Sequence, residues 1–478
     1  MIQINELYNI LPLVILTAGI VLILLLEIIL NKNKLLIYVI SIATALSALV
    51  SSFFLSPKDV FIFNELLKTN NFSVAFGIII LFSVLLTFVS SKPYLEKSGI
   101  NYGEYYIIVL CAALGMLLMI FGNDFLIIFL GLELMSVCFY ILVGFFRRRI
   151  KSNESALKYL LLGAFISGFL LYGISMMYGA TGSTKISMYI TIAGITKTPV
   201  FLIGLILFII GFLFKMGAFP FQMWIPDVYE GAPTVVTGLM STAGKIAAVG
   251  TIAPIIIGFN IAELKTLISI IAVLTMLFGN VIALAQTSIK RLLAYSSIAS
   301  AGYVLVGVAS LDEFAVKGIA FYLTAYVFMQ LGAFIVISIY ESSSADGKDF
   351  NLLNLDDYKG LAGRNPLLGI IFTVFLLSLA GIPPFAGFWG KYYLFYAAIK
   401  SNLIWLSVVA ILLSLVSLYY YLKVIVYMWF TEPAEINSGI KIPFDIYGKI
   451  TLLIAVAGTI VFGINPNLFF IIFNFVVK

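Results

Sequence analysis

The stretch FLIIFLGLELMSVCFYILVGFF, residues 125–146, decides the fold class of this chain of 478 residues. It is as long as an α-helix that crosses the hydrocarbon core of a bilayer, which takes about 20 apolar residues. One carboxylate, Glu133, lies in its middle. A charge at that depth costs roughly 2.5–3.5 kcal/mol on insertion scales, so we interpret Glu133 as a functional group.

Lysines interrupt three further apolar stretches. Lys215 lies in FLIGLILFIIGFLFKMGAF, Lys245 in VVTGLMSTAGKIAAVGTIAPIII, and Lys391 in LAGIPPFAGFWGKYYLF. Burial disfavours an ammonium and a nearby carboxylate favours it, so a lysine that gains and loses a carboxylate partner can bind and release a proton. Glu133 and Lys215 are the candidate pair. The alternative is a static ion pair that only fixes helix packing.

The composition indicates a membrane protein that crosses the bilayer many times, because 62% of the residues are hydrophobic and only 10% are charged. Apolar length predicts an all-α fold with about fourteen transmembrane helices. The first has no basic leader or cleavage site and is expected to be an ordinary span. The predicted spans are residues 10–30, 35–55, 73–90, 104–122, 124–146, 155–179, 200–219, 234–258, 264–286, 292–310, 314–340, 366–398, 403–429 and 446–473.

The basic residues of the connections predict the orientation, since cytoplasmic loops retain more Lys and Arg. One side carries fifteen: Lys32, Lys34, Lys92, Lys97, Arg147, Arg148, Arg149, Lys151, Lys290, Arg291, Lys348, Lys359, Arg364, Lys441 and Lys449. The other side carries eight: Lys58, Lys68, Lys185, Lys197, Lys265, Lys317, Lys400 and Lys478. Both termini are therefore expected on the non-cytoplasmic side. The run Arg147–Arg149 is interpreted as a topology anchor and not as a nucleic-acid or lipid site.

Several kinds of chemistry lack the residues that they need. The chain has no histidine, and its two cysteines, Cys111 and Cys138, lie within predicted spans. Iron–sulfur clusters and structural zinc take about four Cys or His ligands, so the sequence predicts neither in this chain. The segment GATGSTK (179–185) has the wrong spacing for a phosphate-binding loop. Proton transfer would then use carboxylates, lysines, hydroxyls and water.

Two predicted spans are broken in related ways. Both contain Gly-x-x-Pro-Phe, beginning at Gly217 and at Gly381, and both breaks adjoin an intramembrane lysine. Irregular backbone at membrane depth is tolerated where protein or a water-filled cavity satisfies it. The spacing predicts two five-helix repeats that are inverted, because each has an odd number of spans. The predicted units are residues 1–103 with three helices, 104–260 and 261–430 with one repeat each, and 431–478 with the last helix.

Long strings of the sequence resemble the subunit N family of the proton-pumping NADH:quinone oxidoreductase, respiratory complex I. The resemblance covers most of the chain and extends more broadly to Mrp-type cation/proton antiporters. The strings are GLELMSVCFYILVGF (131–145), SNESALKYLLLGAFISGFLLYGISMMYGATGST (152–184), FKMGAFPFQMWIPDVYEGAPTVVTGLMSTAGKIAA (214–248), KRLLAYSSIASAGYVLVG (290–307) and LAGRNPLLGIIFTVFLLSLAGIPPFAGFWGKYYLF (361–395).

The resemblance implies roles in a proton relay. It assigns the row Glu133, Lys215, Lys245 and Lys391, and adds Lys158 near the start of the sixth span, where a snorkelling surface lysine is the alternative. Many relatives have histidine at the position of Gln222. Gln cannot change charge, so water or hydroxyls such as those of Tyr229 and Tyr295 must substitute here.

The resemblance also implies a setting for the chain. It predicts a bacterial inner-membrane subunit that pumps protons while partner subunits, which hold the quinone site, FMN and iron–sulfur clusters, carry electrons from NADH to quinone. No cofactor is expected in this chain, and subunits K, M, J and L are the expected neighbours. The alternatives are an Mrp-type Na⁺/H⁺ antiporter subunit, an antiporter-like subunit of a membrane-bound hydrogenase, and a purely structural membrane scaffold.

Overall fold

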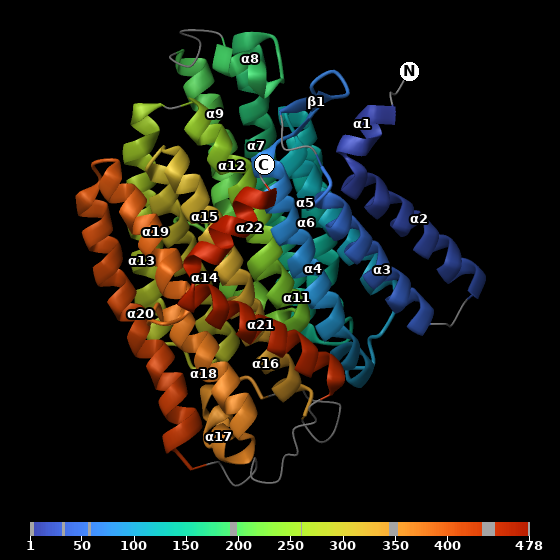
Figure 1. The fold of residues 1–478 in the computed structure, drawn as a ribbon, viewed down its shortest axis with the longest axis vertical. Helices are drawn as coiled ribbons and strands as arrows, with labels where there is room; N and C mark the ends of the chain where they lie inside the picture. The colour runs from blue at the N-terminus through green and yellow to red at the C-terminus, as the bar shows by residue number, and fades with distance from the viewer. Residues whose placement is uncertain are drawn as a thin grey trace.

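Helices account for nearly all of the computed structural model, which describes residues 4–30, 34–55, 59–191, 198–259, 261–343, 352–432 and 445–476 (Figure 1). Residue 260, the predicted end of the first repeat, lies outside these ranges. So do six of the basic residues that predict orientation: Lys32, Lys58, Lys197, Lys348, Lys441 and Lys478.

The first part of the chain forms helices around one short hairpin. Strands β1 and β2 pair antiparallel, with Phe61 opposite Lys68. The elements are α1 (Ile4–Asn9), α2 (Leu11–Leu30), α3 (Lys34–Ser52), β1 (Val60–Ile62), β2 (Leu67–Thr69), α4 (Asn71–Lys97), α5 (Gly103–Phe121), α6 (Phe125–Val143), α7 (Ile150–Thr181), α8 (Ile186–Thr191), α9 (Pro199–Met216) and α10 (Trp224–Gly231).

The second part contains helices and their connections but no strand in its described residues, and two of its long helices contain a π-helical turn, η2 and η3. The elements are α11 (Thr234–Leu239), η2 (Met240–Gly244), α12 (Lys245–Phe259), α13 (Ala262–Leu284), α14 (Ile289–Ala309), α15 (Glu313–Tyr326), η3 (Val327–Leu331), α16 (Gly332–Glu341), η4 (Leu355–Tyr358), α17 (Leu361–Arg364), α18 (Pro366–Ala380), α19 (Ala386–Lys400), α20 (Ile404–Phe430), α21 (Ile446–Ile464) and α22 (Pro466–Val476).

Thirteen helices in the described ranges are long and apolar enough to cross a membrane, which confirms a polytopic all-α fold. They correspond to thirteen of the fourteen predicted spans. The remaining prediction, 366–398, is two shorter helices, α18 and α19, separated by the Gly and Pro segment. The predicted span 446–473 likewise divides, because α21 ends at Ile464 and α22 begins at Pro466.

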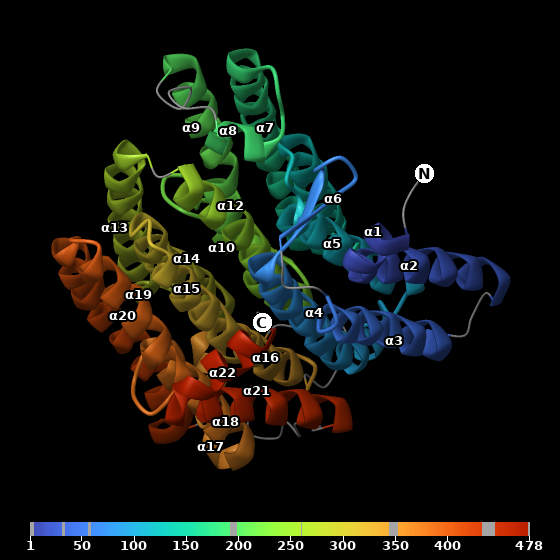
Figure 2. The same ribbon diagram turned by 45° about the horizontal axis from the view of Figure 1, so that its top comes forward.

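Burial separates central helices from peripheral ones. In α14 and in the span Phe314–Glu341, 94% of the apolar window is buried, against 33% in α2 and 28% in α20. Figures 1 and 2 show α2 and α3 at one side of the bundle, α13 and α20 at the other, and α21 running obliquely across one face. The exposed leucines and isoleucines of the peripheral helices are suited to contact lipid or other membrane subunits.

The two ends of the helix bundle are distinguished by the residues that lie there. Helix α6 begins beside the hairpin, where Asn123 donates its backbone N–H to the carbonyl of Leu66 at 2.9 Å, and it leads to the run Arg147–Arg149. We call these the hairpin end and the arginine end. Thr234 of α11 and Lys290 of α14 lie at the arginine end, and Glu341 is the last residue of α16 at that end.

Both predicted helix breaks are present, and each begins at a glycine. Helix α9 ends at Met216 before Gly217 with φ 72°, and α18 ends at Ala380 before Gly381 with φ 87°. Glycine adopts this left-handed conformation without the steric cost that a side chain adds. The next residues are then free to leave the helix and form a second one. The division into two inverted repeats stays a prediction.

Candidate functional site

Lys245 lies at the centre of the molecule, at the junction of η2 and α12. It is 3% exposed, and its Nζ donates to the Ser297 carbonyl and, at 2.6 Å, to the Ser297 hydroxyl. The ring of Tyr326 lies 5.2 Å from the same Nζ. Turn η3 follows Tyr326 directly and packs against η2. Single π-helical turns inside α-helices are frequent at functional sites, and here two of them flank one buried cation.

Helix α14 presents a row of polar side chains that leads away from Lys245. Ser296, Ser300 and Tyr303 are spaced by four and then three residues, so they follow one side of the helix, and Ser297 lies beside the first of them. Ser296 is hydrogen-bonded to the hydroxyl of Tyr421. All four residues are at least 96% buried. The sequence contains a signal for this row, a cluster of hydroxyls within an apolar span, but the cluster alone does not reveal which lysines it lies between.

The row ends beside Lys391. The Lys391 Nζ lies 4.9 Å from the centre of the Tyr303 ring and donates to the carbonyl of Ala380 at 2.9 Å. That carbonyl belongs to the last residue of α18, where helical carbonyls lack partners and a cation is favourable. A side chain at Gly381 would meet the Lys391 chain at 3.0 Å. The glycine therefore permits both the helix break and the approach of the lysine.

Lys215 occupies an aromatic cage at the other break. It lies in the last turn of α9, is 8% exposed, and has its Nζ 5.3–5.5 Å from the rings of Tyr140, Tyr159 and Phe214. The same Nζ donates to the Tyr140 hydroxyl at 3.4 Å. Ring faces attract a cation, so the cage can hold an ammonium without a contacting anion.

Glu133 lies near Lys215 but is bonded elsewhere. Its carboxylate is partly buried and accepts a hydrogen bond from the Ser167 hydroxyl of α7 at 2.5 Å. The two charges interact electrostatically, yet within the described part of the chain they form no ion pair. Tyr140, which bonds Lys215, follows Glu133 by two turns of α6. Direct pairing of Glu133 and Lys215 stays a prediction.

Lys158 lies apart from the buried row. Its side chain is 45% exposed at the arginine end and pairs with Glu154 at 2.7 Å and with Asp227 at 2.9 Å. Arg291 pairs with the other oxygen of Asp227 at 2.8 Å. Burial alone would raise the pKa of the Asp227 carboxyl, but the hydrogen bonds from Lys158 and Arg291 outweigh it and hold this pKa below its usual value. This arrangement is a surface ion-pair network.

Lys290 is placed differently from the sequence prediction. The prediction that Lys290 is a loop residue is wrong, because Lys290 is the second residue of α14 and is 1% exposed. Its Nζ donates to the carbonyls of Ala232 at 2.7 Å and Glu230 at 3.1 Å. The backbone of the connection between α10 and α11 therefore replaces water around this ammonium, which apolar length alone cannot reveal.

Gln222 is buried after the first break. It is 6% exposed, and its Oε1 has no hydrogen-bond partner among the residues that the structure describes. Gln330 in η3 has an unpartnered Oε1 as well and is fully buried. An unsatisfied buried amide oxygen is costly, so each position is suited to a bound water.

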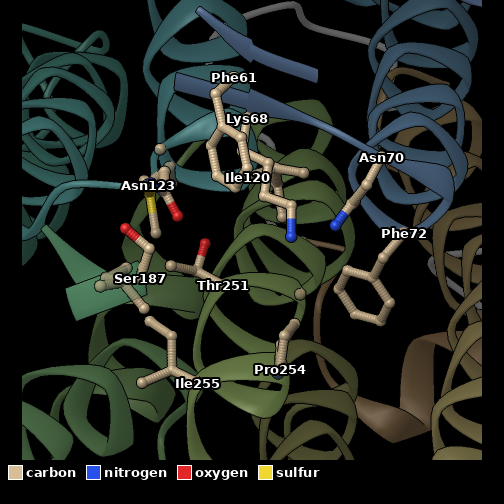
Figure 3. Close-up of a pocket in the computed structure, with 14 residues that line it drawn as sticks. Phe61, Lys68, Asn70, Phe72, Ile120, Asn123, Ser187, Thr251, Pro254 and Ile255 are labelled. Carbon is tan, nitrogen blue, oxygen red and sulfur yellow. The ribbon is translucent and has the colours of Figure 1, made fainter. Parts of the chain in front are cut away.

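The structure has one cavity at the hairpin end and another at the arginine end. One of about 330 Å³ lies at the hairpin end, where the nitrogen atoms of Lys68 and Asn70 point toward Thr251 of α12 (Figure 3). Thr251 lies six residues beyond Lys245, about 9 Å along the helix. A second cavity of about 1060 Å³ lies at the arginine end and is lined in part by Arg149 and Glu230.

Comparison with known proteins agrees with this geometry. Residues 122–417 match the family described as NADH:quinone oxidoreductase/Mrp antiporter, TM. A protein of Trichlorobacter lovleyi named NADH-quinone oxidoreductase subunit N is 44% identical over 413 residues, which cover 85% of this chain and 83% of that protein.

Solved structures share the fold. A chain of respiratory complex I from Thermus thermophilus with bound aureothin superposes with a TM-score of 0.82 at 32% identity, over 96% of this chain and 98% of that one. A chain of the Mrp complex from Dietzia has a TM-score of 0.84 at 19% identity, covering 99% and 97%. The latter shows the fold alone. The chain therefore belongs to the NADH:quinone oxidoreductase/Mrp antiporter family of membrane proteins and, within it, to the group whose members are named subunit N.

Proposed function

We propose that this chain is the proton-translocating membrane subunit of an NADH:quinone oxidoreductase. The observation that carries the proposal is Lys245, a buried ammonium at two π-helical turns, from which the polar row of α14 leads toward Lys391. Family membership supports it, since the relatives at 44% identity are named for that enzyme. An Mrp-type antiporter is the second candidate, but its support is likeness of fold at 19% identity.

The proposed mechanism is an electrostatic relay. A signal from partner subunits changes the interaction of Glu133 with Lys215, which alters the proton occupancy of Lys245 and then of Lys391. Ser297 and Tyr303, which contact the last two lysines, are six residues apart, about 9 Å along α14. Two unit charges about 10 Å apart repel by about 1.7 kcal/mol at an effective dielectric constant near 20. Moving one charge against 100 mV costs about 2.3 kcal/mol, which is of the same order.

Membership of the family supports a proposed setting for the chain. We place the chain in a bacterial inner membrane with both termini on the non-cytoplasmic side, so that the arginine end faces the cytoplasm. Subunits K, M, J and L are the proposed neighbours, and the quinone site, FMN and iron–sulfur clusters belong to partner subunits. The two cavities would give water access to the protein interior from opposite sides of the bilayer.

The test is proton pumping by the assembled complex. We expect Lys245→Ala and Lys215→Ala to leave the complex assembled and to weaken pumping and its coupled quinone reduction. Lys317→Ala, at the hairpin end outside the relay, is the control. Normal pumping by an assembled Lys245→Ala complex would refute the relay. Sodium-dependent transport without quinone reduction would favour the antiporter candidate.

A further inference from the structure

Glu341 is a buried carboxylate that the relay does not use. It ends α16 and is 1% exposed. It accepts hydrogen bonds from the Tyr94 hydroxyl of α4 at 3.3 Å and from the Thr234 hydroxyl. Thr234 also donates its backbone N–H to the Tyr94 oxygen at 3.3 Å. No Lys or Arg in the described ranges forms an ion pair with Glu341.

A buried cation lies on the other side of the same short turn. The turn, Ala232 and Pro233, joins α10 to α11, and Thr234 follows it. Lys290 donates to the carbonyl of Ala232 in this turn and to that of Glu230 near the end of α10. Lys290 and Glu341 interact electrostatically without direct contact. A buried charge without a contacting counter-ion is costly, so this arrangement calls for a reason beyond packing.

The surroundings of the two groups are defined. Tyr94 of α4 and Tyr358 of η4 face Glu341, and Glu230 of α10 and Arg149, which precedes α7, face Lys290. Glu230 and Arg149 also line the cavity of about 1060 Å³ at the arginine end. Glu230 therefore borders the cavity and also accepts from Lys290 through its backbone carbonyl.

Helix α14 connects this cluster to the central lysine. Lys290 and Ser297 are seven residues apart, which places them on one face and about 10 Å apart along the axis. Ser297 bonds Lys245 at 2.6 Å, and the Tyr229 hydroxyl of α10 interacts with Ser297. Helix α10 packs against α14. Polar groups therefore extend from the turn to Lys245.

We propose that Glu341 is a further proton-relay residue, which takes up protons at the arginine end and controls their release from Lys290 toward Lys245. A proton from the cavity binds the Glu341 carboxylate and neutralises it. Lys290 then loses an electrostatic partner and passes its own proton to unprotonated Lys245 through Tyr229, Ser297 and water. The proton on Glu341 reloads Lys290, so one proton enters and one moves on. This step rests on the proposed function and deepens it.

The decisive comparison is Glu341→Gln with Glu341→Asp in the assembled complex. The amide oxygen of Gln can still accept from Tyr94 and Thr234 but cannot take up a proton, whereas Asp keeps a carboxylate that is one methylene shorter. We expect Gln to reduce pumping at least about tenfold and Asp to restore much of it. The control is Asp356→Asn, which removes a carboxylate with 71% side-chain exposure at the same end.

The opposite ranking would overturn the proposal, because a purely structural role predicts that Gln pumps normally and that Asp is impaired. A second variant, Lys290→Gln, keeps an N–H donor for the turn carbonyls and removes the charge, and we expect a similar loss. Normal pumping in that variant, or failure of both Gln variants to assemble, would assign the cluster to structure. If Lys245→Ala abolishes pumping and Glu341→Gln does not, only this inference fails; if Lys245→Ala pumps normally, the proposed function fails.

Discussion

The hydroxyl of Ser297 should set the rate of proton transfer at Lys245. Ser297→Ala deletes one of two acceptors that this residue offers to the Lys245 ammonium, the hydroxyl at 2.6 Å, and leaves the backbone carbonyl in place. A hydrogen bond to a charged group contributes about 1.5–3 kcal/mol. Its loss changes the equilibrium between the two protonation states of Lys245 by roughly 10- to 150-fold, at 1.36 kcal/mol for each factor of ten. The same change removes the partner of the Tyr229 hydroxyl.

The assay compares proton pumping with quinone reduction in membrane vesicles that contain the assembled complex. We expect Ser297→Ala to lower pumping by about tenfold or more. The matched control is Ser310→Ala directly after the same helix, which removes a buried hydroxyl whose one bond within the described residues is to the Val306 carbonyl at 3.1 Å. Pumping within about twofold of the parent protein in assembled Ser297→Ala would refute the reasoning, as would an equal loss in the control.

Two further predictions concern stability. Gly115→Ala should lower the thermal stability of the complex or prevent its assembly, because the added Cβ would lie 2.6 Å from the backbone nitrogen of Met135, where α5 crosses α6. The control is Gly168→Ala, whose added Cβ would have no described atom within 4 Å. Equal stability and assembly of the two variants would contradict the packing argument. Asp227→Asn should lower the unfolding temperature at pH 7, because a carboxyl with a lowered pKa stabilises the folded state above its ordinary value of 3.8 and loses that contribution as pH falls through the folded value. If the unfolding temperatures of the variant and the parent still differ by the same amount below the folded pKa, then the ionised Asp227 carboxylate does not cause the difference.

The helices were largely predictable because their signal is local. A run of about 20 apolar residues specifies a span whatever surrounds it, and thirteen of the predicted spans contain one long apolar helix, although the last continues beyond Ile464 as a second helix, α22. The breaks at Gly217 and Gly381 were predictable from Gly and Pro. The π-helical turns η2 and η3 were not, because no residue type specifies them.

Part of the candidate site was predictable because its signal is also local in the sequence. A charge within an apolar span stands out, so Glu133, Lys215, Lys245 and Lys391 could be named from the sequence. Lys290 and Glu341 lie at the ends of spans, where a charge is ordinary, so nothing in the residue pattern distinguishes them from loop charges. Only their burial, at 1% exposure each, distinguishes them.

The amino-acid sequence by itself determined the membrane class, the succession of spans and the identity of the mid-span charges, because hydrophobic length and the cost of a charge in lipid depend on the residues alone. The tertiary structure decided which groups meet: Lys245 with Ser297, Lys391 with the end of α18, Lys215 with an aromatic cage, and Glu341 with Thr234. These contacts depend on how each helix is rotated and tilted against its neighbours, which packing between distant segments sets.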